Sequence, residues 1–386
     1  MAPGWPDVVI VGGGIVGTSA AAFLAQAGAR VTIVERDEIA SAASGRNSGV
    51  VQHPFDPVLA ALHLETLDLY RSLANESVKG GPAFAMPSRA AGLMLVSTDA
   101  TGTERLSREA RQIAPHLDPM YLAPGEAQRR EPALAADVAA CRLDIGYPVE
   151  PGAATRAYAA LAESKGAHLR IGSAATLLVD GDRVTGVHTE AGDIVAGAVI
   201  VAAGPWSTDV IDPGGRWRPI EPNWGVVVDV ELADPPAHVL EEAEIDAAIE
   251  PSAAGDSAEL APLAFSLVTP LTASGERRSA LGSTFLTEEP EPAVYRHALI
   301  DRGARYVPGV STATVRGIRA CARPISADGR PLVGRVPWLE GACIAAGNGP
   351  WGISTGPATG RMIADLVLGR ESAIPNALDP GRFGSL

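Results

Sequence analysis

The sequence predicts an α/β fold in which separated stretches of chain build a parallel sheet, joined to a second unit with mostly antiparallel strands. Near the N-terminus, the β-branched run Val8–Val11 is followed by a Gly-rich turn, a helical stretch to Ala27 and the apolar run Arg30–Glu35. Apolar runs this short, separated by a helix, are typical of neighbouring strands buried on both faces of a parallel sheet. The segment therefore predicts a βαβ unit.

Two later parts of the chain repeat this pattern. After Gly146 the sequence predicts a helix over Thr155–Ser164 and strands near Leu169–Ile171, Thr176–Val179, Val184–Thr189 and Ala198–Ala202. Between two of those strands, Asp180-Gly181-Asp182 favours a tight hairpin turn. The C-terminal part adds a strand at Ala342–Ala346, a Gly-rich loop over Gly347–Gly356 and an apolar helix that ends near Leu368.

The intervening segments have a different texture. They hold strand-like runs and Pro-rich joints, at Gly92–Val96, Gly225–Leu232, Asp234–Pro236, Phe265–Val268, Ser279–Ser283 and Glu289–Pro292. We therefore predict a discontinuous, Rossmann-like nucleotide-binding domain from residues 1–80, 146–220 and 316–386. Residues 81–145 and 221–315 would form an inserted α+β substrate domain with a mostly antiparallel sheet.

Composition excludes several classes of protein. The 386 residues carry a net charge of −14 with scattered basic residues, which would repel nucleic acid. The cysteines Cys141, Cys321 and Cys343 have no spacing that suggests a disulfide framework or a thiolate metal site, and no His or carboxylate pattern suggests another metal site. No signal peptide and no run long enough to cross a bilayer is evident, so we expect a cytoplasmic protein without a membrane span.

The Gly-rich turn after the first predicted strand has the spacing G-x-G-x-x-G, at Gly12, Gly14 and Gly17. Such glycines permit a tight turn, a close approach of a pyrophosphate, and close packing of helix and strand. Glu35, at the end of the second strand, is placed to accept hydrogen bonds from ribose hydroxyls and to repel a 2′-phosphate. The motif predicts FAD or NAD rather than NADP, and does not separate FAD from NAD.

A second small-residue segment follows, Ser44-Gly45-Arg46-Asn47-Ser48-Gly49. Its amides and hydroxyls could bind a pyrophosphate or the edge of a flavin, and the alternative interpretation is a plain turn.

Four blocks together carry a family resemblance. They are the N-terminal βαβ unit, the Ser44–Gly49 segment, the pair Gly146–Pro151 and Val199–Ser207, and Arg323-Pro324-Ile325-Ser326-Ala327-Asp328-Gly329 running into the Gly347–Gly360 region. In these blocks the chain resembles the D-amino-acid oxidase-like FAD-dependent oxidoreductases, the group that contains glycine oxidase and the sarcosine oxidases. The resemblance implies FAD as the cofactor.

The resemblance also implies site residues. Arg323 falls where family members pair an Arg with the substrate carboxylate, a role that suits a planar guanidinium. The alternative is a structural Arg paired with an acid such as Asp328. Arg319 is a second candidate that could share the role, and Trp351 would either face the substrate or pack in the core.

The segment Gly347–Ser354 would wrap the flavin ring, with the positive end of the following helix near it. The predicted FAD contacts are Gly12, Gly14, Ile15, Val16, Gly17, Glu35, Arg36, Ser44, Gly45, Arg46, Asn47, Ser48, Gly49, Val50, Ala175, Ala203, Gly204, Trp206, Gly349, Pro350, Trp351, Gly352, Ile353 and Ser354.

Cys321 has the spacing to Asp328 at which sarcosine oxidase-like enzymes place the Cys that bonds covalently to FAD. The neighbouring Ala322-Arg323-Pro324 is more similar to the non-covalent glycine oxidase type. We therefore expect non-covalent FAD and a buried structural thiol.

The predicted function is FAD-dependent oxidation of a small amino acid or secondary amine acid. Hydride would pass from Cα–H to flavin N5, and the resulting imine would hydrolyse. Trp224, Phe265, Leu267 and Arg46 are the expected pocket residues, which favour a small or apolar amine. The electron acceptor and any homo-oligomer are not identified by the sequence.

Three alternatives stay open. One is a FAD-dependent 2-hydroxy-acid dehydrogenase with His53 as the base that takes the hydroxyl proton. Another is an NAD-dependent dehydrogenase. The third is a flavin-binding subunit of a heteromeric amine dehydrogenase.

Overall fold

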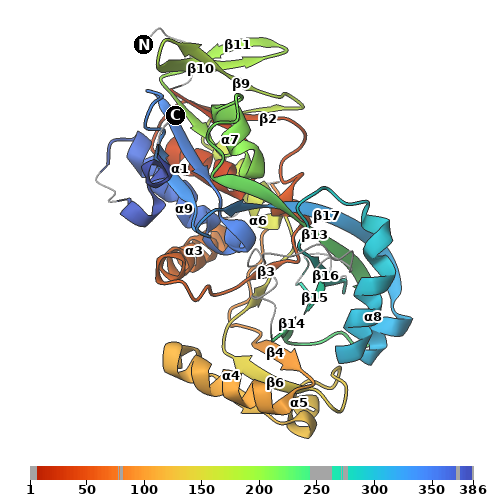
Figure 1. Ribbon diagram of the computed structural model, residues 1–386. Coiled ribbons are helices and arrows are strands. Elements are labelled where there is room, and N and C mark those ends of the chain that lie inside the picture. The colour runs from red at the N-terminus through yellow and green to blue at the C-terminus, as the bar shows by residue number, and fades with distance from the viewer. Residues whose placement is uncertain are drawn as a thin grey trace.

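Figure 1 shows the fold of the chain as a computed structural model. The structure describes residues 7–76, 78, 81–243, 263–270, 272, 277–370 and 374–384. In these ranges the strands gather into one largely parallel sheet, one large mixed sheet and two small antiparallel sheets.

The largely parallel sheet has six strands in the order β18-β19-β12-β1-β2-β8. Its members are β1 (Val8–Val11), β2 (Val31–Glu35), β8 (His168–Ile171), β12 (Ala198–Val201), β18 (Leu332–Arg335) and β19 (Ala342–Ala346). All neighbours are parallel except β18, which runs antiparallel to β19 at the edge. The prediction that three separated stretches build one parallel sheet, as in a Rossmann-like fold, is confirmed.

Each face of this sheet is covered by a different layer. Val8, Ile10, Ile33 and Ile200 face a helical layer, whereas alternate residues such as Val9 face the small sheet on the other side. The helices are α1 (Ile15–Gln26), α3 (Pro57–Asn75), α6 (Ala153–Ser164) and α9 (Gly352–Val367).

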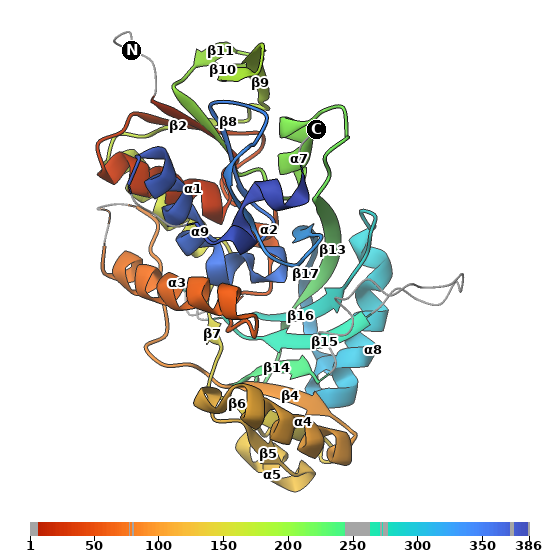
Figure 2. The ribbon, with the colours of Figure 1, turned by 60° about the vertical axis from the view of Figure 1, so that its left-hand side comes forward.

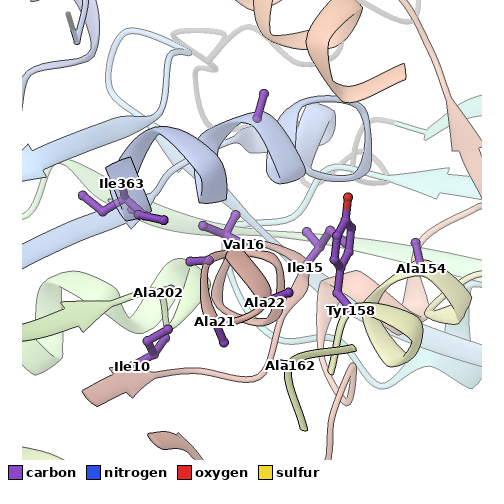
Figure 3. Packing of buried hydrophobic residues seen from close by; sticks show 14 of the residues in the cluster. Ile10, Ile15, Val16, Ala21, Ala22, Ala154, Tyr158, Ala162, Ala202 and Ile363 are labelled. Atoms are coloured by element: carbon purple, nitrogen blue, oxygen red, sulfur yellow. The ribbon is translucent and has the colours of Figure 1, made fainter. Parts of the chain in front are cut away.

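Helix α1 lies at the centre of the helical layer, where Figure 3 shows Ile15, Val16 and Ala22 between Tyr158 and Ile363. A Cβ atom at Gly360 of α9 would collide with Ser19, so small residues let the two helices approach closely.

The small sheet on the opposite face is a three-stranded antiparallel meander. It consists of β9 (Thr176–Asp180), β10 (Arg183–Thr189) and β11 (Gly192–Val195). The predicted hairpin at Asp180–Asp182 is confirmed, with Gly181 at a φ of 64° in the left-handed region that favours glycine. Figure 1 shows this sheet at the top, above β2.

The large mixed sheet has eight strands in the order β17-β13-β16-β15-β14-β4-β6-β5. Its members are β4 (Leu93–Ser97), β5 (Met120–Leu122), β6 (Ala139–Leu143), β13 (Ile220–Glu231), β14 (Val239–Glu242), β15 (Leu263–Val268), β16 (Ser279–Thr284) and β17 (Thr314–Ser326). Strand β17 pairs with β13 along its whole length. Residues 316–326 therefore belong to this sheet, whereas the predicted domain boundaries assigned them to the nucleotide-binding domain.

Two helices cover opposite faces of the large sheet. Helix α8 (Arg296–Tyr306) packs on the face that holds Phe265 and Leu267, and Figure 2 shows it beside β15 and β16. Helix α4 (Ala100–Ile113) packs through Leu106 and Ala110 against the other face.

The remaining helices, strands and 3₁₀ turns are short and lie between the elements described above. They are α2 (Ala43–Arg46), β3 (Val50–Val51), α5 (Pro124–Arg130), β7 (Tyr147–Pro148), α7 (Ser207–Ile211) and the 3₁₀ turns η1 (Pro115–Leu117), η2 (Gly204–Trp206), η4 (Pro292–Tyr295), η5 (Pro308–Thr312), η6 (Gly349–Trp351), η7 (Asn376–Leu378) and η8 (Pro380–Phe383). Strands β3 and β7 pair as a two-stranded antiparallel sheet.

Two loop predictions are wrong in detail. The Ser44–Gly49 segment begins inside the one-turn helix α2, and the segment expected to be a loop over Gly347–Gly356 is already helical from Gly352. Helices α3, α4, α5 and α8 were not predicted. Among the described residues, no helix is both long enough and apolar enough to cross a bilayer.

Candidate functional site

A cavity of about 760 Å³ lies between the parallel sheet and the large mixed sheet. One half is lined by the Gly-rich turn after β1, the segment after β2, and the beginning of α9. The other half is lined by one face of the large sheet and by α4. We call these the glycine half and the sheet half.

The Gly-rich turn brings backbone to the wall of the glycine half. Gly12 has a φ of 115°, and a Cβ atom there would collide with the carbonyl oxygen of Ala202 on the neighbouring strand. A Cβ atom at Gly17 would collide with the Gly12 carbonyl oxygen, so this glycine lets α1 pack against the turn. The two glycines are therefore required by close approach within the protein.

Helix α1 begins at this wall. Its N-cap residue, Gly14, has no side chain to cap the helix, and the first turn holds no acidic residue. The Ile15 amide donates instead to the Ser44 hydroxyl oxygen at 3.0 Å. A helix of this length presents partial positive charge and amide donors at its N-terminus. The wall is therefore suited to an anionic phosphate group.

Glu35 lies at the end of β2, beside the turn. Its Oε2 atom accepts a hydrogen bond from the Gly13 amide at 2.6 Å, and its Oε1 atom accepts one from the Asp37 amide at 2.8 Å. These bonds fix the carboxylate at the cavity wall, and each oxygen keeps a further lone pair for a ribose hydroxyl.

Arg36 and Trp206 lie together further along the same wall. The guanidinium carbon of Arg36 is 4.8 Å from the centre of the Trp206 ring, and both residues line the cavity next to Ala203 and Gly204. This stacking gives the end of the glycine half a planar surface.

Helix α9 begins on the opposite side of the glycine half. It has no side-chain cap at Trp351 and no acidic residue in its first turn, and Gly352, Ile353 and Ser354 line the cavity. Beside them, Asn348 also lines the cavity, and its buried side-chain amide donates to the hydroxyl oxygens of Thr355 and Thr359, both at 2.9 Å. A second helix N-terminus without a cap from its own N-cap side chain therefore faces the same cavity.

Most of the residues predicted to contact a flavin nucleotide line this cavity. Those that do are Gly12, Gly14, Ile15, Val16, Glu35, Arg36, Ser44, Asn47, Ser48, Val50, Ala175, Ala203, Gly204, Trp206, Gly349, Pro350, Trp351, Gly352, Ile353 and Ser354.

Four predicted residues do not line it, namely Gly17, Gly45, Arg46 and Gly49. The glycines serve close backbone packing, since a Cβ at Gly45 or Gly49 would collide with the carbonyl oxygen of Ala40 or Val149. The Arg46 side chain is exposed.

Arg323 projects from β17 into the sheet half. Its guanidinium donates to Ser283 Oγ at 2.6 Å, to the Thr284 carbonyl at 3.0 Å and to Asn223 Oδ1 at 3.1 Å. It crosses β13 at Gly225, where a Cβ atom would collide with it, and it lies 4.8 Å from the centre of the Phe285 ring.

All three hydrogen-bond partners of Arg323 are neutral, and burial lowers the pKa of the guanidinium. In the part of the chain that the structure describes, no carboxylate lies within salt-bridge distance of it. The alternative of a structural pair with Asp328 is wrong, because Asp328 binds Arg382 at 2.8 Å. A desolvated cation that faces a cavity without a counter-charge favours an anionic ligand.

Arg319 lies on the same strand but has a different environment. It pairs with Asp229 and donates to the carbonyl oxygens of Arg46 and Asn47, both at 2.9 Å. It does not line the cavity. Arg319 therefore ties the α2 segment to the large sheet, and the structure gives no support to a shared role with Arg323.

Two other predicted residues line the cavity from the protein core. Trp351 packs partly against the helical layer and also lines the cavity. The two predicted positions, in the core and facing the substrate, therefore each describe one side of this residue. Cys321 is buried, lines the cavity beside Arg323, and has a pKa raised by burial.

The pocket residues predicted for the sheet half are wrong. Phe265 and Leu267 point to the opposite face, toward α8, together with Trp224, and none of them lines the cavity. Ser266, the residue between them, does. Successive residues in a strand face opposite sides of the sheet, so the predicted pocket residues are one position away from the residue that lines the cavity.

Several cavity residues were missed altogether. Gln52 and Glu241 line the sheet half, and the Gln52 amide donates to Glu241 Oε2 at 3.0 Å. Helix α4 adds Leu106, Glu109, Ala110 and Ile113. No local motif marks these residues, because their meeting depends on contacts between distant segments.

His53 does not line the cavity, although Gln52 before it does. Its ring is buried between His63 and His116, with ring centres 5.2 Å and 5.6 Å away. Burial and the neighbouring His116 lower the pKa of His53. Among the described residues, no group of His, Cys, Asp and Glu has the geometry of a metal site.

Comparison with known proteins decides the family. Residues 7–366 match the family model described as FAD dependent oxidoreductase. The chain belongs to this family. FAD is therefore its cofactor, and the glycine half, with helix N-termini on both sides and the Glu35 carboxylate fixed at its wall, fits a dinucleotide.

Individual relatives span the whole chain. It is 30% identical to a glycine oxidase from Pseudomonas aeruginosa over 96% of this chain and 97% of that protein. It is 29% identical to a D-amino acid dehydrogenase from Paramagnetospirillum magneticum, over 98% and 99%. The crystal structure of a glycine oxidase from Geobacillus kaustophilus superposes with a TM-score of 0.81 at 26% identity, covering 98% of both chains.

Proposed function

We propose that this FAD-dependent oxidoreductase oxidises a carboxylated amine, an amino acid or secondary amine acid, at its Cα–N bond. The single observation that carries the proposal is the environment of Arg323. Its guanidinium faces the cavity, is desolvated, and within the described ranges of the chain has only neutral partners. A carboxylate bound there would provide the missing counter-charge.

Bound FAD supplies the two-electron acceptor. The chain's own contribution is to hold the substrate carboxylate on Arg323, so that Cα is directed toward the glycine half. The leucines of the sheet half, Leu93, Leu95 and Leu143, exclude water from the reacting carbon. An amine in such surroundings favours its neutral form, whose lone pair assists loss of hydride from Cα.

Among the residues that the structure describes, no histidine lines the cavity to serve as the base that a 2-hydroxy acid would require. His53 does not line the cavity, and its ring packs against two other histidines. The curated relatives reported above are named for amino acids, which supports an amine substrate. One is named an oxidase and the other a dehydrogenase, so the proposal includes no particular electron acceptor.

We further propose that FAD is held without a covalent bond. Burial raises the pKa of Cys321, which keeps its sulfur as a thiol rather than the nucleophilic thiolate. Acid denaturation of the yellow protein should release all of the flavin into the supernatant. Flavin that precipitates with the polypeptide would contradict this part of the proposal.

The decisive experiment is anaerobic mixing of the holoenzyme with matched pairs of amino acids and 2-hydroxy acids. We expect the flavin absorbance near 450 nm to bleach with amino acids, and not with the hydroxy acids of the same side chain. Bleaching by the hydroxy acids alone would overturn the amine assignment. A flavin that no member of either class reduces would indicate a binding subunit whose partner performs the chemistry.

A further inference from the structure

A carboxylate lies across the sheet half from Arg323. Glu241, on β14, lines the cavity, and its Oε2 atom accepts a hydrogen bond from the Gln52 side-chain amide at 3.0 Å. Gln52 is in turn fixed by its own backbone amide, which donates to Ser354 Oγ at 2.8 Å in the first turn of α9. The Glu241 carboxylate is therefore held in place at the cavity wall.

Strand register places Glu241 relative to Arg323. Glu241 lies opposite Ser266 on β15, and Ser266 lies opposite Gly282 on β16, next to the Ser283 hydroxyl that accepts from Arg323. Two strand spacings, roughly 10 Å across the sheet, thus separate the backbone of Glu241 from that of β16, whose Ser283 hydroxyl accepts from Arg323.

The surroundings of Glu241 favour the binding of a positively charged group to its carboxylate. Leu95 lies opposite Glu241 on β4, and Leu106 faces the same space from α4, so this part of the wall is apolar. A second carboxylate, Glu109, lines the cavity at an exposed position of α4. In such surroundings the attraction between a carboxylate and a cation is stronger than in water.

We propose that Glu241 is the specificity-determining residue of the site, and that it binds a positively charged nitrogen on the side chain of the substrate. The substrate class is then a basic amino acid or a secondary amine acid with a second basic nitrogen. This inference rests on the proposed function, because it takes the substrate carboxylate to lie on Arg323. It also replaces the expectation of an apolar amine, which depended on Phe265 and Leu267.

The α-nitrogen is a poor partner for Glu241. A carboxylate beside that nitrogen would stabilise the protonated ammonium form, which has no lone pair to assist oxidation. A nitrogen further along the side chain carries no such conflict. The separation between the charged groups selects the chain length, which the series of ligands below measures.

The test uses ligands that bind both ends without being oxidised. β-Alanine, 4-aminobutanoate, 5-aminopentanoate and 6-aminohexanoate are each compared with the unsubstituted acid of the same length. Dissociation constants of the holoenzyme come from calorimetry and from the perturbation of flavin absorbance. We expect the amino form to bind about 10–100-fold more tightly at one chain length, as a charge-assisted hydrogen bond would give.

Two variants test whether the tighter binding of the amino form depends on the Glu241 carboxylate. Glu241→Gln keeps the shape and an acceptor for Gln52, so it should abolish the difference between amino and unsubstituted acids while changing binding of the unsubstituted acids by less than about threefold. Glu109→Gln, at the rim of the same cavity, is the matched control and should keep the difference. Oxidation should show the same pattern, with a raised KM for ornithine and little change for norvaline.

The outcomes separate the two proposals. No gain from the ammonium at any length, or a gain that survives Glu241→Gln, would overturn the role of Glu241 and leave Arg323 untouched. Equal loss for amino and unsubstituted acids in Glu241→Gln would indicate a structural role and overturn the proposal as well. Undiminished binding of all these acids to Arg323→Leu would instead overturn the proposed function.

Discussion

The two halves of the cavity are built by different means. The glycine half is largely backbone, with amides and helix N-termini that belong to short local segments after β1 and at the start of α9. The sheet half is made of side chains from several strands, and its central bonds join residues far apart in sequence, such as Gln52 and Glu241, 189 positions apart. The first half fits the cofactor that the family shares, whereas the second is the half that we propose selects the substrate.

The largest effect should come from adding one methyl group to the glycine half. Gly12→Ala combines a φ of 115° with a collision against the Ala202 carbonyl oxygen. We expect a cost of more than about 3 kcal/mol and near-complete loss of bound flavin, measured as flavin absorbance per protein. Gly28→Ala is the control, because Gly28 also has a positive φ but no atom within contact distance of the added Cβ. Equal flavin content in both variants would contradict the close-approach argument.

The next effect is confined to the sheet half. Arg323→Leu should keep its flavin but lose roughly 100- to 1000-fold in kcat/KM for carboxylated amines, because a charge-assisted pair is removed. Arg319→Leu should do the opposite, weakening flavin retention through the α2 segment while leaving KM nearly unchanged. An Arg323→Leu enzyme with wild-type kcat/KM would remove the assignment.

Local patterns were enough to predict much of the glycine half. The βαβ unit, the position of Glu35 and the hairpin at Asp180–Asp182 all follow from short-range spacing. The start of α9 did not follow, because glycine disfavours a helix. Gly356 and Gly360 are nevertheless helical, since only a residue without a side chain fits against Ile15 and Ser19 of α1.

The sheet half was harder to predict because it depends on which face a strand presents. Phe265 and Leu267 are apolar enough to suggest a pocket, yet they face α8, and Ser266 between them faces the cavity. Arg323 was found only through the family resemblance. Glu241 was missed, since nothing local distinguishes it from its neighbour Glu242, which binds Arg302 at 2.7 Å on the other face.

A third prediction concerns His63, a buried residue of helix α3 in the helical layer. Burial, with the nearby ring of His53, lowers the pKa of His63 on α3 to about 4, against roughly 6.5 in an unfolded chain. The unfolded state therefore binds the proton more tightly, and stability falls as the pH drops from about 6.5 to 4. The loss is at most roughly 3 kcal/mol.

Denaturant unfolding between pH 4 and pH 7.5 measures this dependence. His63→Gln should flatten it, whereas His168→Gln, at an exposed position of β8, should leave it as in the wild type. An unchanged pH dependence in His63→Gln would show that other groups are responsible.

The smallest effect should come from Asn348. Asn348→Ala removes two buried hydrogen bonds to Thr355 and Thr359, at a cost of about 1–2 kcal/mol in unfolding free energy. Because these bonds support the start of α9 in the glycine half, the order of preference among substrates should not change. A change in that order, measured by anaerobic flavin reduction, would mean that the two halves are not separable.

The most direct test of the whole account is a crystal structure of the holoenzyme with a non-reactive carboxylate such as propanoate. The account predicts the FAD diphosphate against the Gly12–Gly14 turn and the propanoate oxygens on the guanidinium of Arg323. A diphosphate bound elsewhere, or a carboxylate that avoids Arg323 while its neutral partners stay in place, would contradict it.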